Sequence, residues 1–282
     1  SDWSSDVCSS DLSKPMSKLE LRSLSPLSEI PFARPSSTVV LVRPAPAEPE
    51  LFMVRRHAKS SFGAAHAFPG GVVDPEDNAV HGFCTGIAAK TADANLGVKE
   101  DGLDYYSAAI RELFEESGVL LADPDAVAEG LDAARDALND RSDNWADFVK
   151  RNRLALQCEQ LHYFSHWITP TPLRKRYSTR FFLAVMPAGQ VASHCGWELT
   201  DSCWITASDA LAAGRAGDIT LHFPTIKTLE SIARHKTFDA LVDWASSCVE
   251  WGVTSILAKI IERDGREEIV LPGEIGYPGT EA

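Results

Sequence analysis

The segment 104–118 constrains the fold of this chain more than any other part of the sequence. It reads DYYSAAIRELFEESG, which has the period of an amphipathic helix that Asp104 would cap and Gly118 would end. At about 100° per residue, three carboxylates fall on one face, at roughly 0°, 300° and 40°: Glu112, Glu115 and Glu116. The opposite face carries Ile110, Leu113 and Phe114. The sequence therefore predicts a helix that buries one side and displays three carboxylates together.

This acidic face has two interpretations. On a solvated helix face without a counter-ion, the carboxylate pairs 112/115 and 112/116 repel each other by about 0.2–0.5 kcal/mol each. A hard divalent cation such as Mg²⁺ reverses that sign, because it takes oxygen ligands and bridges carboxylates to substrate phosphates. The context favours the cation. Arg111 directly precedes the face, and a Pro-Gly-Gly turn at 69–71 lies upstream, where backbone can approach a ligand closely.

Strand-like and helix-like segments alternate along the chain. Runs of β-branched and aromatic residues predict strands at 38–44, 51–56, 161–169, 179–186 and 201–206. Periodicity and capping residues predict further helices near 86–94, from Asp123-Pro124, from Ser142, at 207–215 with Thr206 as its cap, from Pro224, and at 238–250. This order predicts an α/β (α+β) fold with a mixed sheet and helices outside it, in one elaborated domain.

The composition excludes several classes of partner. The 282 residues include 40 acidic and 27 basic side chains, for a net charge of −13. This charge argues against nucleic acid and against an anionic membrane surface, because both need a basic face. No apolar run reaches the roughly 18–20 residues of a transmembrane helix. The six cysteines are scattered without a C-x-x-C pair, which predicts free thiols in a reducing, cytoplasmic setting.

The first twelve residues, SDWSSDVCSSDL, differ from the rest of the chain. They form a Ser/Asp-rich near-repeat without a helical or strand period. They also lack the cationic and apolar regions of a signal peptide. We interpret residues 1–16 as a non-native or disordered leader and exclude them from the fold.

The stretch R-E-L-F-E-E-S-G-V at 111–119 resembles the motif of a known family. It matches R-E-U-x-E-E-x-G-U, with U an aliphatic residue, which is the second half of the Nudix box; Gly70 and Glu76 match the first half, G-x5-E. Thirty-four residues separate Glu76 from Arg111 where the usual pattern has seven, so 27 are inserted. Such an insertion is known in a branch of larger Nudix proteins that resemble the peroxisomal coenzyme A diphosphatases of animals.

This resemblance implies a Nudix-type α/β/α sandwich with a mixed β-sheet and helical insertions. The Nudix hydrolase domain would span 36–235, with insertions at about 77–103 and 123–156. Residues 236–282 would form a C-terminal helical extension packed on the domain. Long additions near a site are often functional, so we expect a lid or specificity element among them. The resemblance is compatible with a homodimer.

The resemblance also implies a metal site. The ligands of Mg²⁺ or Mn²⁺ would be the carboxylates of Glu112, Glu115 and Glu116. A backbone carbonyl of Gly70 or Gly71 would add a ligand, and Arg111 would pair with Glu76 in a structural role. The metals would polarise a diphosphate and lower the pKa of the attacking water. The general base is open between a helix glutamate and Glu198.

For the substrate, this branch implies coenzyme A or acyl-coenzyme A, cleaved to phosphopantetheine, or its acylated form, and adenosine 3′,5′-bisphosphate. Residues 51–71 follow the coenzyme A signature of the branch only in outline. Basic side chains that would receive the terminal phosphate, or that would simply solubilise loops, are Arg55, Arg56, Lys59, Arg174, Lys175, Arg176 and Arg180. The alternatives are another nucleoside diphosphate derivative, such as ADP-ribose or NADH, and a catalytically silent module that senses a nucleotide.

Overall fold

The computed structural model describes residues 32–56, 64–123, 130–171, 173–197, 199–263, 265–274 and 277–278, apart from the side chain of Arg56. The chain forms two compact units. Of the described residues, the larger unit contains 34–166 and 179–255, and the smaller one contains 32–33, 167–178 and those from 256 onward. The predicted leader at 1–16 lies outside the described residues. The segment 104–118, which carries the predicted metal site, belongs to the larger unit.

The described strands form one eight-stranded sheet and two small sheets. They are β1 (Arg34–Arg43), β2 (Glu50–Arg56), β3 (His66–Ala67), β4 (Gly70–Val72), β5 (Cys84–Thr85), β6 (Leu156–Gln157), β7 (His162–Ile168), β8 (Tyr177–Val185), β9 (Leu199–Thr206), β10 (Ser255–Leu257), β11 (Lys259–Arg263) and β12 (Arg266–Val270). The large sheet has the order β10-β7-β8-β1-β2-β3, with β4 on β1 and β9 on β2. β1 pairs with β2 near its end, where Val42 is opposite Leu51, and with β4 near its start, where Ser37 is opposite Gly71.

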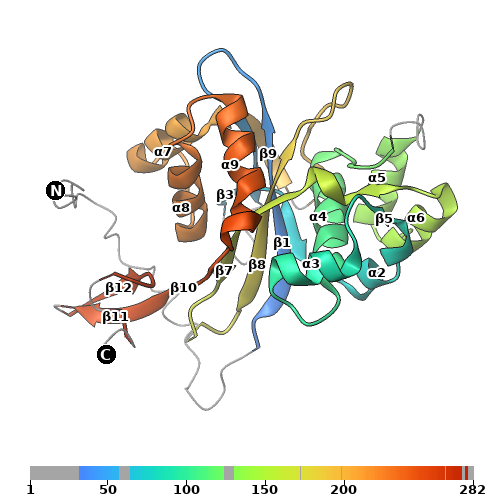
Figure 1. The fold of residues 1–282 in the computed structure, drawn as a ribbon. Helices are drawn as coiled ribbons and strands as arrows, with labels where there is room; N and C mark the ends of the chain where they lie inside the picture. The colour runs from blue at the N-terminus through green and yellow to red at the C-terminus, as the bar shows by residue number, and fades with distance from the viewer. Residues whose placement is uncertain are drawn as a thin grey trace. The chain divides into compact units, whose positions relative to one another are not determined.

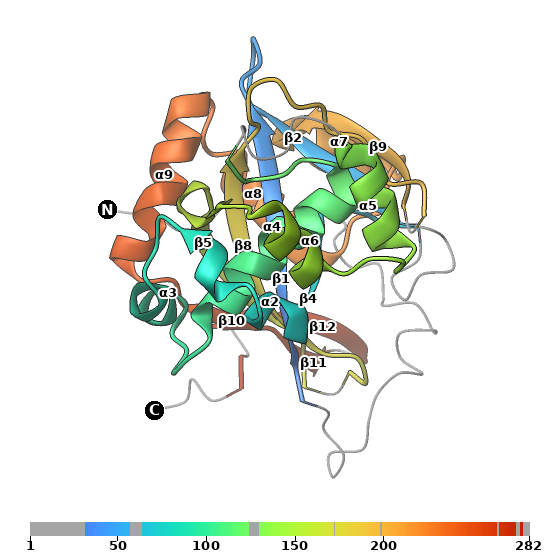
Figure 2. The ribbon, with the colours of Figure 1, turned by 90° about the vertical axis from the view of Figure 1, so that its right-hand side faces the viewer.

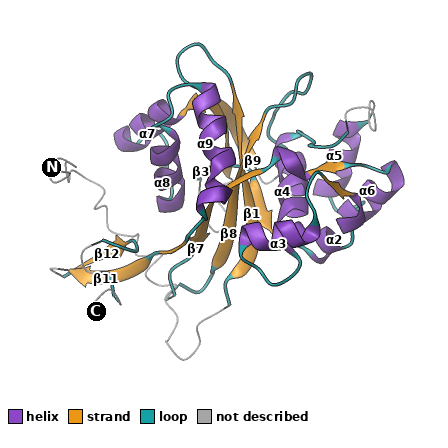
Figure 3. Ribbon diagram, viewed as in Figure 1, coloured by secondary structure: helices purple, strands orange, loops and turns teal. Residues whose placement is uncertain are grey.

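Helices cover both faces of the large sheet. They are α2 (Pro75–Asn78), α3 (Ala89–Leu96), α4 (Gly102–Ser117), α5 (Leu131–Asn139), α6 (Trp145–Asn152), α7 (Ala207–Ala216), α8 (Phe223–Ile232) and α9 (Phe238–Trp251). The sheet lies between the group α2–α6 and the group α7–α9 (Figures 1 and 3). No helix in the described part of the chain has the length and apolar character needed to cross a membrane.

Ring contacts show that the strands pack against helices on both faces of the sheet. Tyr163 of β7 contacts Phe182 of β8 with ring centroids 5.6 Å apart, and Phe182 contacts Tyr106 of α4 at 4.9 Å. The next residue of β7, Phe164, contacts Trp244 of α9 at 5.3 Å. Successive side chains of a strand point to opposite faces, so α4 and α9 pack on opposite faces. The expected α/β class, with a mixed sheet and outer helices, is confirmed.

Helix α4 lies across β1 and β4 (Figure 2) and begins earlier than predicted. Its N-cap residue is Asp101, in the left-handed region with a φ of 59°, and not Asp104. The side chain of Asp104 is already used, because its Oδ1 lies 2.6 Å from Nε2 of His81. The predicted end is confirmed, since Gly118 has a φ of 76° and its N–H caps the last turn. The buried face includes the three predicted residues Ile110, Leu113 and Phe114.

The regions predicted as additions contain regular structure. The segment 77–103 holds β5 and α3, and the described part of 123–156 holds α5 and α6. The cap of α6 is Asn144, whose Oδ1 accepts from the N–H of Asp147 at 2.9 Å, and not the predicted Ser142.

The prediction that 236–282 is helical is only partly right. Helix α9 is followed by the strands β10, β11 and β12. β11 and β12 pair antiparallel, with Ile260 opposite Ile269. β-branched residues such as these isoleucines favour strands over helices. The boundaries of the predicted domain stay a prediction.

Candidate active site

Arg111 of α4 forms a buried ion pair with Asp77 of α2. Its Nε and Nη2 donate to Oδ1 and Oδ2 of Asp77 at 3.1 and 3.0 Å, a bidentate arrangement. Asp77 is fully buried and also accepts from the N–H of Asp74 at 2.8 Å and from Oγ of Ser107 at 2.9 Å. The pair fixes the loop after β4 against α4. Breaking it would leave an uncompensated buried charge.

The predicted pairing of Arg111 with Glu76 is wrong. Oε2 of Glu76 accepts instead from the backbone N–H of Trp145, the first residue of α6, at 2.8 Å. A carboxylate is favourable there because the first N–H groups of a helix have no partner within it. Glu76 and Asp77 are neighbours in a one-turn helix, so they point in different directions, and Asp77 is the one that faces α4.

The three predicted carboxylates of α4 lie around Arg111 and β4. Oε1 of Glu112 accepts from Nη1 of Arg111 at 2.8 Å, and Oε2 of Glu115 lies 3.5 Å from the same nitrogen. Oε2 of Glu116, a residue only 6% exposed, accepts from the N–H of Gly70 at 2.9 Å. The side chains of Glu112 and Glu115 are 13% and 21% exposed. The structure therefore brings both halves of the predicted motif together.

Negative charge is in excess in this cluster. Burial, together with the charges of Glu112 and Asp77, raises the pKa of Glu115 to about 7, although Arg111 opposes them. Burial lowers the pKa of Arg111, but the carboxylates of Glu112 and Asp77 raise it well above its ordinary value overall. An added divalent cation would relieve this repulsion, and an all-carboxylate donor set suits Mg²⁺ or Mn²⁺. The residues present fit such an ion.

Two glycines lie where β4 approaches α4. A Cβ on Gly71 would lie 2.3 Å from Oε1 of Glu112, and one on Gly70 would lie 2.4 Å from the carbonyl oxygen of Ser37. Both distances are far below van der Waals contact, so a methyl group at 70 would meet the backbone of β1, and one at 71 would displace the carboxylate of Glu112. The role of the Gly70 carbonyl as a metal ligand stays a prediction.

The last turn of α4 is held by Arg135, which the sequence did not predict as a site residue. Arg135 of α5 donates from Nε to the carbonyl of Glu115 at 3.0 Å and from Nη2 to that of Glu116 at 2.8 Å. A cation is favourable at a helix C-terminus. The one sign of this role in the sequence is that Arg135 lies between Leu131 and Leu138, within an apolar stripe where a charged residue is unusual. The inserted segment 123–156 thereby positions two of the carboxylates.

A second acidic group lies at the other end of α4. Ligand atoms of His81, Asp101 and Asp104 lie within 4.8 Å of one another, the one such group of three in the described part of the chain. Nδ2 of Asn78 donates to Asp101 and Asp104 at 3.1 Å each. These hydrogen bonds account for the cluster, and we assign no metal to it.

The predicted substrate-binding residues have different positions. Arg55 is exposed on β2, opposite Asp201 of β9. Arg176 belongs to the smaller unit, where its Nε donates to the carbonyl of Thr169 at 3.2 Å. Arg180 is buried on β8. The side chain of Arg56, Lys59 and the predicted base Glu198 lie outside the described residues. Contact with substrate stays a prediction for all of them.

Known proteins show similarity to this chain. A family model described as the NUDT19 Nudix domain matches residues 88–232, which include α4 but begin after Gly70 and Gly71. Putative nudix hydrolase 7 of Caenorhabditis elegans is 27% identical over 195 residues, covering 67% of this chain and 57% of that protein. The human acyl-coenzyme A diphosphatase NUDT19 is 27% identical over 262 residues, covering 77% and 69%.

Among solved structures, a NUDIX hydrolase from Alicyclobacillus acidocaldarius superposes with a TM-score of 0.66 and 25% identity. The match covers 76% of this chain and 97% of that one. The chain spans little more than half the length of the nematode relative.

Proposed function

Because the chain belongs to the Nudix hydrolases and is a hydrolase acting on diphosphate bonds, we propose that its substrate is coenzyme A or an acyl-coenzyme A. The products would be phosphopantetheine, or its acylated form, and adenosine 3′,5′-bisphosphate. The observation that carries the chemistry is the excess of carboxylates around Arg111. The substrate class rests on the similarity to the acyl-coenzyme A diphosphatases, which is at 27% identity for the human protein.

The proposed metal ligands are the side chains of Glu112, Glu115 and Glu116, with the Gly70 carbonyl beside them. Bound Mg²⁺ or Mn²⁺ would polarise the diphosphate and lower the pKa of the attacking water. Arg111 and Asp77 are positioning residues, since their ion pair holds the loop after β4 against α4. Arg135 positions the carboxylates from the opposite end, through the carbonyls of the last turn. The general base is either a helix glutamate or Glu198.

A substrate panel tests the proposal. The purified protein is incubated with Mg²⁺ or Mn²⁺ and with coenzyme A, acyl-coenzyme A, ADP-ribose or NADH, and the products are identified by mass spectrometry. We expect adenosine 3′,5′-bisphosphate from the coenzyme A compounds, and no turnover when a chelator removes the metal. Rapid cleavage of ADP-ribose without turnover of coenzyme A would overturn the substrate assignment. Tight binding without any hydrolysis would support the nucleotide-sensing alternative.

A further inference from the structure

The inserted helices α5 and α6 contact the carboxylate site of α4 at two places. Helix α5 packs on α4, and α6 packs on α2, the one-turn helix that carries Asp77. Both belong to the segment 123–156, for which the resemblance implies an addition to the domain. One contact is made at the last turn of α4 and the other near Ser107, about 12–14 Å away along the helix axis.

The backbone of Glu115 is held by two donors from α5. Its carbonyl oxygen accepts from Nε of Arg135 and from Nδ2 of Asn139, each at 3.0 Å. Nδ2 of Asn139 also donates to the carbonyl of Arg135, four residues earlier in its own helix, at 3.0 Å. Both hydrogens of this amide are therefore used, one within α5 and one across to α4. Because the last carbonyls of a helix have no partner within it, these side chains complete the end of α4.

The loop between β8 and β9 belongs to the same group of contacts. The N–H of Ser193 donates to the carbonyl of Ser117, the last residue of α4, at 2.9 Å. Arg135 reaches this loop as well, since its Nη2 donates to the carbonyl of Ser193 at 2.6 Å. The side-chain amide of Gln190 accepts from the N–H of Leu120 at 2.8 Å and donates to its carbonyl at 2.9 Å. Helix α5 and this loop are thus both fixed to the turn that carries two of the proposed metal ligands.

Helix α6 makes the second contact through its first residue. Nε1 of Trp145 donates to Oγ of Ser107 on α4 at 3.0 Å, and this hydroxyl donates to Oδ1 of Asp77 at 2.9 Å. The backbone N–H of Trp145 donates to Oε2 of Glu76 at 2.8 Å. Both acidic residues of α2 are therefore linked to α6, Glu76 directly and Asp77 through Ser107. The second of these links ends at the ion pair of Asp77 with Arg111.

The inserted helices are part of the hydrophobic core. Leu138 of α5, and Trp145, Phe148 and Val149 of α6, are each at most 7% exposed. The ring of Phe148 stacks on that of Phe114 of α4, with centroids 5.6 Å apart and an interplanar angle of 5°. Lids are drawn from the least stable parts of a protein, which have few buried apolar contacts. This burial favours a fixed support over the lid that the sequence analysis expects among the additions.

We propose that α5 and α6 form a brace that fixes the geometry of the metal site, and that Asn139 is a positioning residue for Glu115. The proposal rests on the proposed function, because it takes the carboxylates of Glu115 and Glu116 as metal ligands. Mg²⁺ requires near-ideal octahedral geometry, so a shift of the last turn of α4 displaces two ligands and weakens metal binding. Groups that hold ligands in place typically contribute about 10–100-fold to metal affinity.

Asn139→Asp tests the brace by a change of nearly constant shape. It replaces the donating amide with a carboxylate oxygen that faces the Glu115 carbonyl, so the last turn of α4 should move. The matched control is Asn152→Asp. Asn152 is likewise the last residue of its helix, and its Nδ2 donates to the carbonyl of Phe148, four residues earlier in the same helix, at 2.8 Å. A carboxylate is unfavourable at both helix C-termini, so the control removes that effect from the comparison.

The first measurement is Mn²⁺ binding to the full chain without substrate, by calorimetry. We expect Asn139→Asp to weaken it about tenfold and Asn152→Asp to leave it unchanged. Amide hydrogen exchange of the metal-free protein should become faster at Gly118, whose N–H donates to the carbonyl of Phe114. Asn139→Ala, which removes the donor without adding a charge, should weaken Mn²⁺ binding less and replaces Asn139→Asp if that variant does not fold.

Turnover separates the brace from the proposed function. With saturating Mn²⁺ and coenzyme A, Asn139→Asp should lower kcat about tenfold and leave KM unchanged, because metal ligands and not substrate contacts are displaced. Wild-type Mn²⁺ affinity and kcat in the Asn139 variants, even with lower stability, would overturn the proposal, as would an equal loss of affinity in Asn152→Asp. If the wild type cleaves none of the substrates, the proposed function fails, and the Mn²⁺ titration still tests the brace.

Discussion

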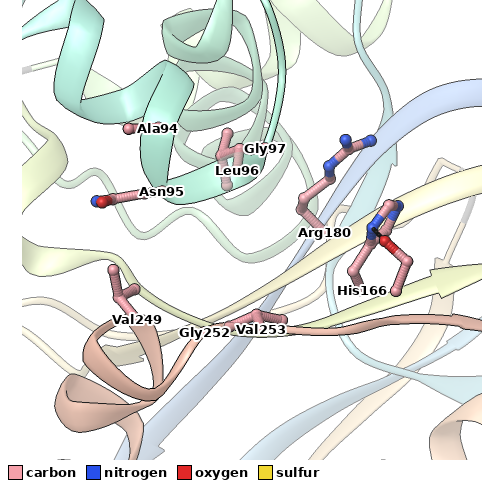
Figure 4. Close-up of a pocket in the computed structure, with 10 residues that line it drawn as sticks. Ala94, Asn95, Leu96, Gly97, His166, Arg180, Val249, Gly252 and Val253 are labelled. Carbon is pink, nitrogen blue, oxygen red and sulfur yellow. Dashed lines mark hydrogen bonds between the residues drawn. The ribbon is translucent and has the colours of Figure 1, made fainter.

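Arg111 and Arg180 are both buried, Arg111 on α4 itself and Arg180 against Tyr105 of α4, but the groups around them differ. Arg111 lies among the carboxylates of Asp77, Glu112 and Glu115, and its guanidinium donates to each of them. Arg180 stacks on Tyr105 and lines a cavity formed by the end of α3, the strands β7 and β8, and the residues that follow α9 (Figure 4). The charge of a buried arginine among several carboxylates is neutralised by its ion pairs, and the excess negative charge that remains attracts a cation. A buried arginine that stacks on a phenol ring contributes instead a ring contact and a hydrogen bond to the ring hydroxyl.

The largest effect on stability is expected when Arg111 is replaced. Arg111→Met leaves Asp77 buried with an uncompensated charge, so the free energy of unfolding should fall by about 3–5 kcal/mol. The matched control is Arg151→Met, which removes an exposed ion pair with Asp143 and should lower the free energy of unfolding far less. Urea unfolding measures both. Equal losses would show that the Arg111 ion pair does not hold the cluster.

Removing one charge from the carboxylate cluster should act on catalysis. Glu116→Gln keeps an oxygen that accepts from the Gly70 N–H but removes a proposed metal ligand, so kcat should fall by about 10²–10³-fold with little change in stability. Glu100→Gln, an exposed acid just before α4, serves as the control and should leave kcat unchanged. Turnover that survives Glu116→Gln would remove this carboxylate from the metal site.

The two regions should also respond to pH with opposite sign. His166 has a folded pKa of about 4 against an ordinary value of 6.5, so between these values the unfolded chain binds a proton that the folded one does not. The free energy of unfolding therefore rises with pH across this window, by up to about 3 kcal/mol, and falls as the pH drops toward 4. Glu115, with a pKa raised from 4.5 to about 7, makes the metal-free protein less stable as the pH rises through that range.

The His166→Gln variant isolates the first contribution. Urea unfolding of this variant and the wild type, with a chelator at pH 4.5, 5.5 and 6.5, gives their stability difference at each pH. The free energy of unfolding of the wild type, relative to that of the variant, should increase as the pH rises. A difference that stays constant with pH would mean that His166 titrates normally and that the cavity is open to water.

The sequence predicts the carboxylate cluster better than the cavity for a physical reason. Helical periodicity places Glu112, Glu115 and Glu116 on one face without any tertiary information. The choice between Glu76 and Asp77 depends on how a one-turn helix is rotated against α4, which no local pattern determines. The role of Arg135 depends on where α5 docks.

The cavity was still less predictable, because α3, β7, β8 and the residues after α9 form it only through tertiary packing. The same applies to the start of α4. Asp104 has the residue type and position of an N-cap, but its contact with His81 comes from a separate segment.

The smallest effect is expected from a single methyl group added in each of the two regions. Gly71→Ala places a Cβ 2.3 Å from Oε1 of Glu112, so this side chain must move, and kcat should fall about tenfold. Stability should change little, since the displaced atom ends a flexible side chain. Gly97→Ala at the cavity rim meets no atom within 4 Å, but its φ of 64° costs about 1 kcal/mol of stability, with kcat unchanged. If Gly71→Ala also leaves kcat unchanged, catalysis does not depend on the position of Glu112. The carboxylates would then tolerate displacement, and the close approach of β4 to α4 would serve packing alone.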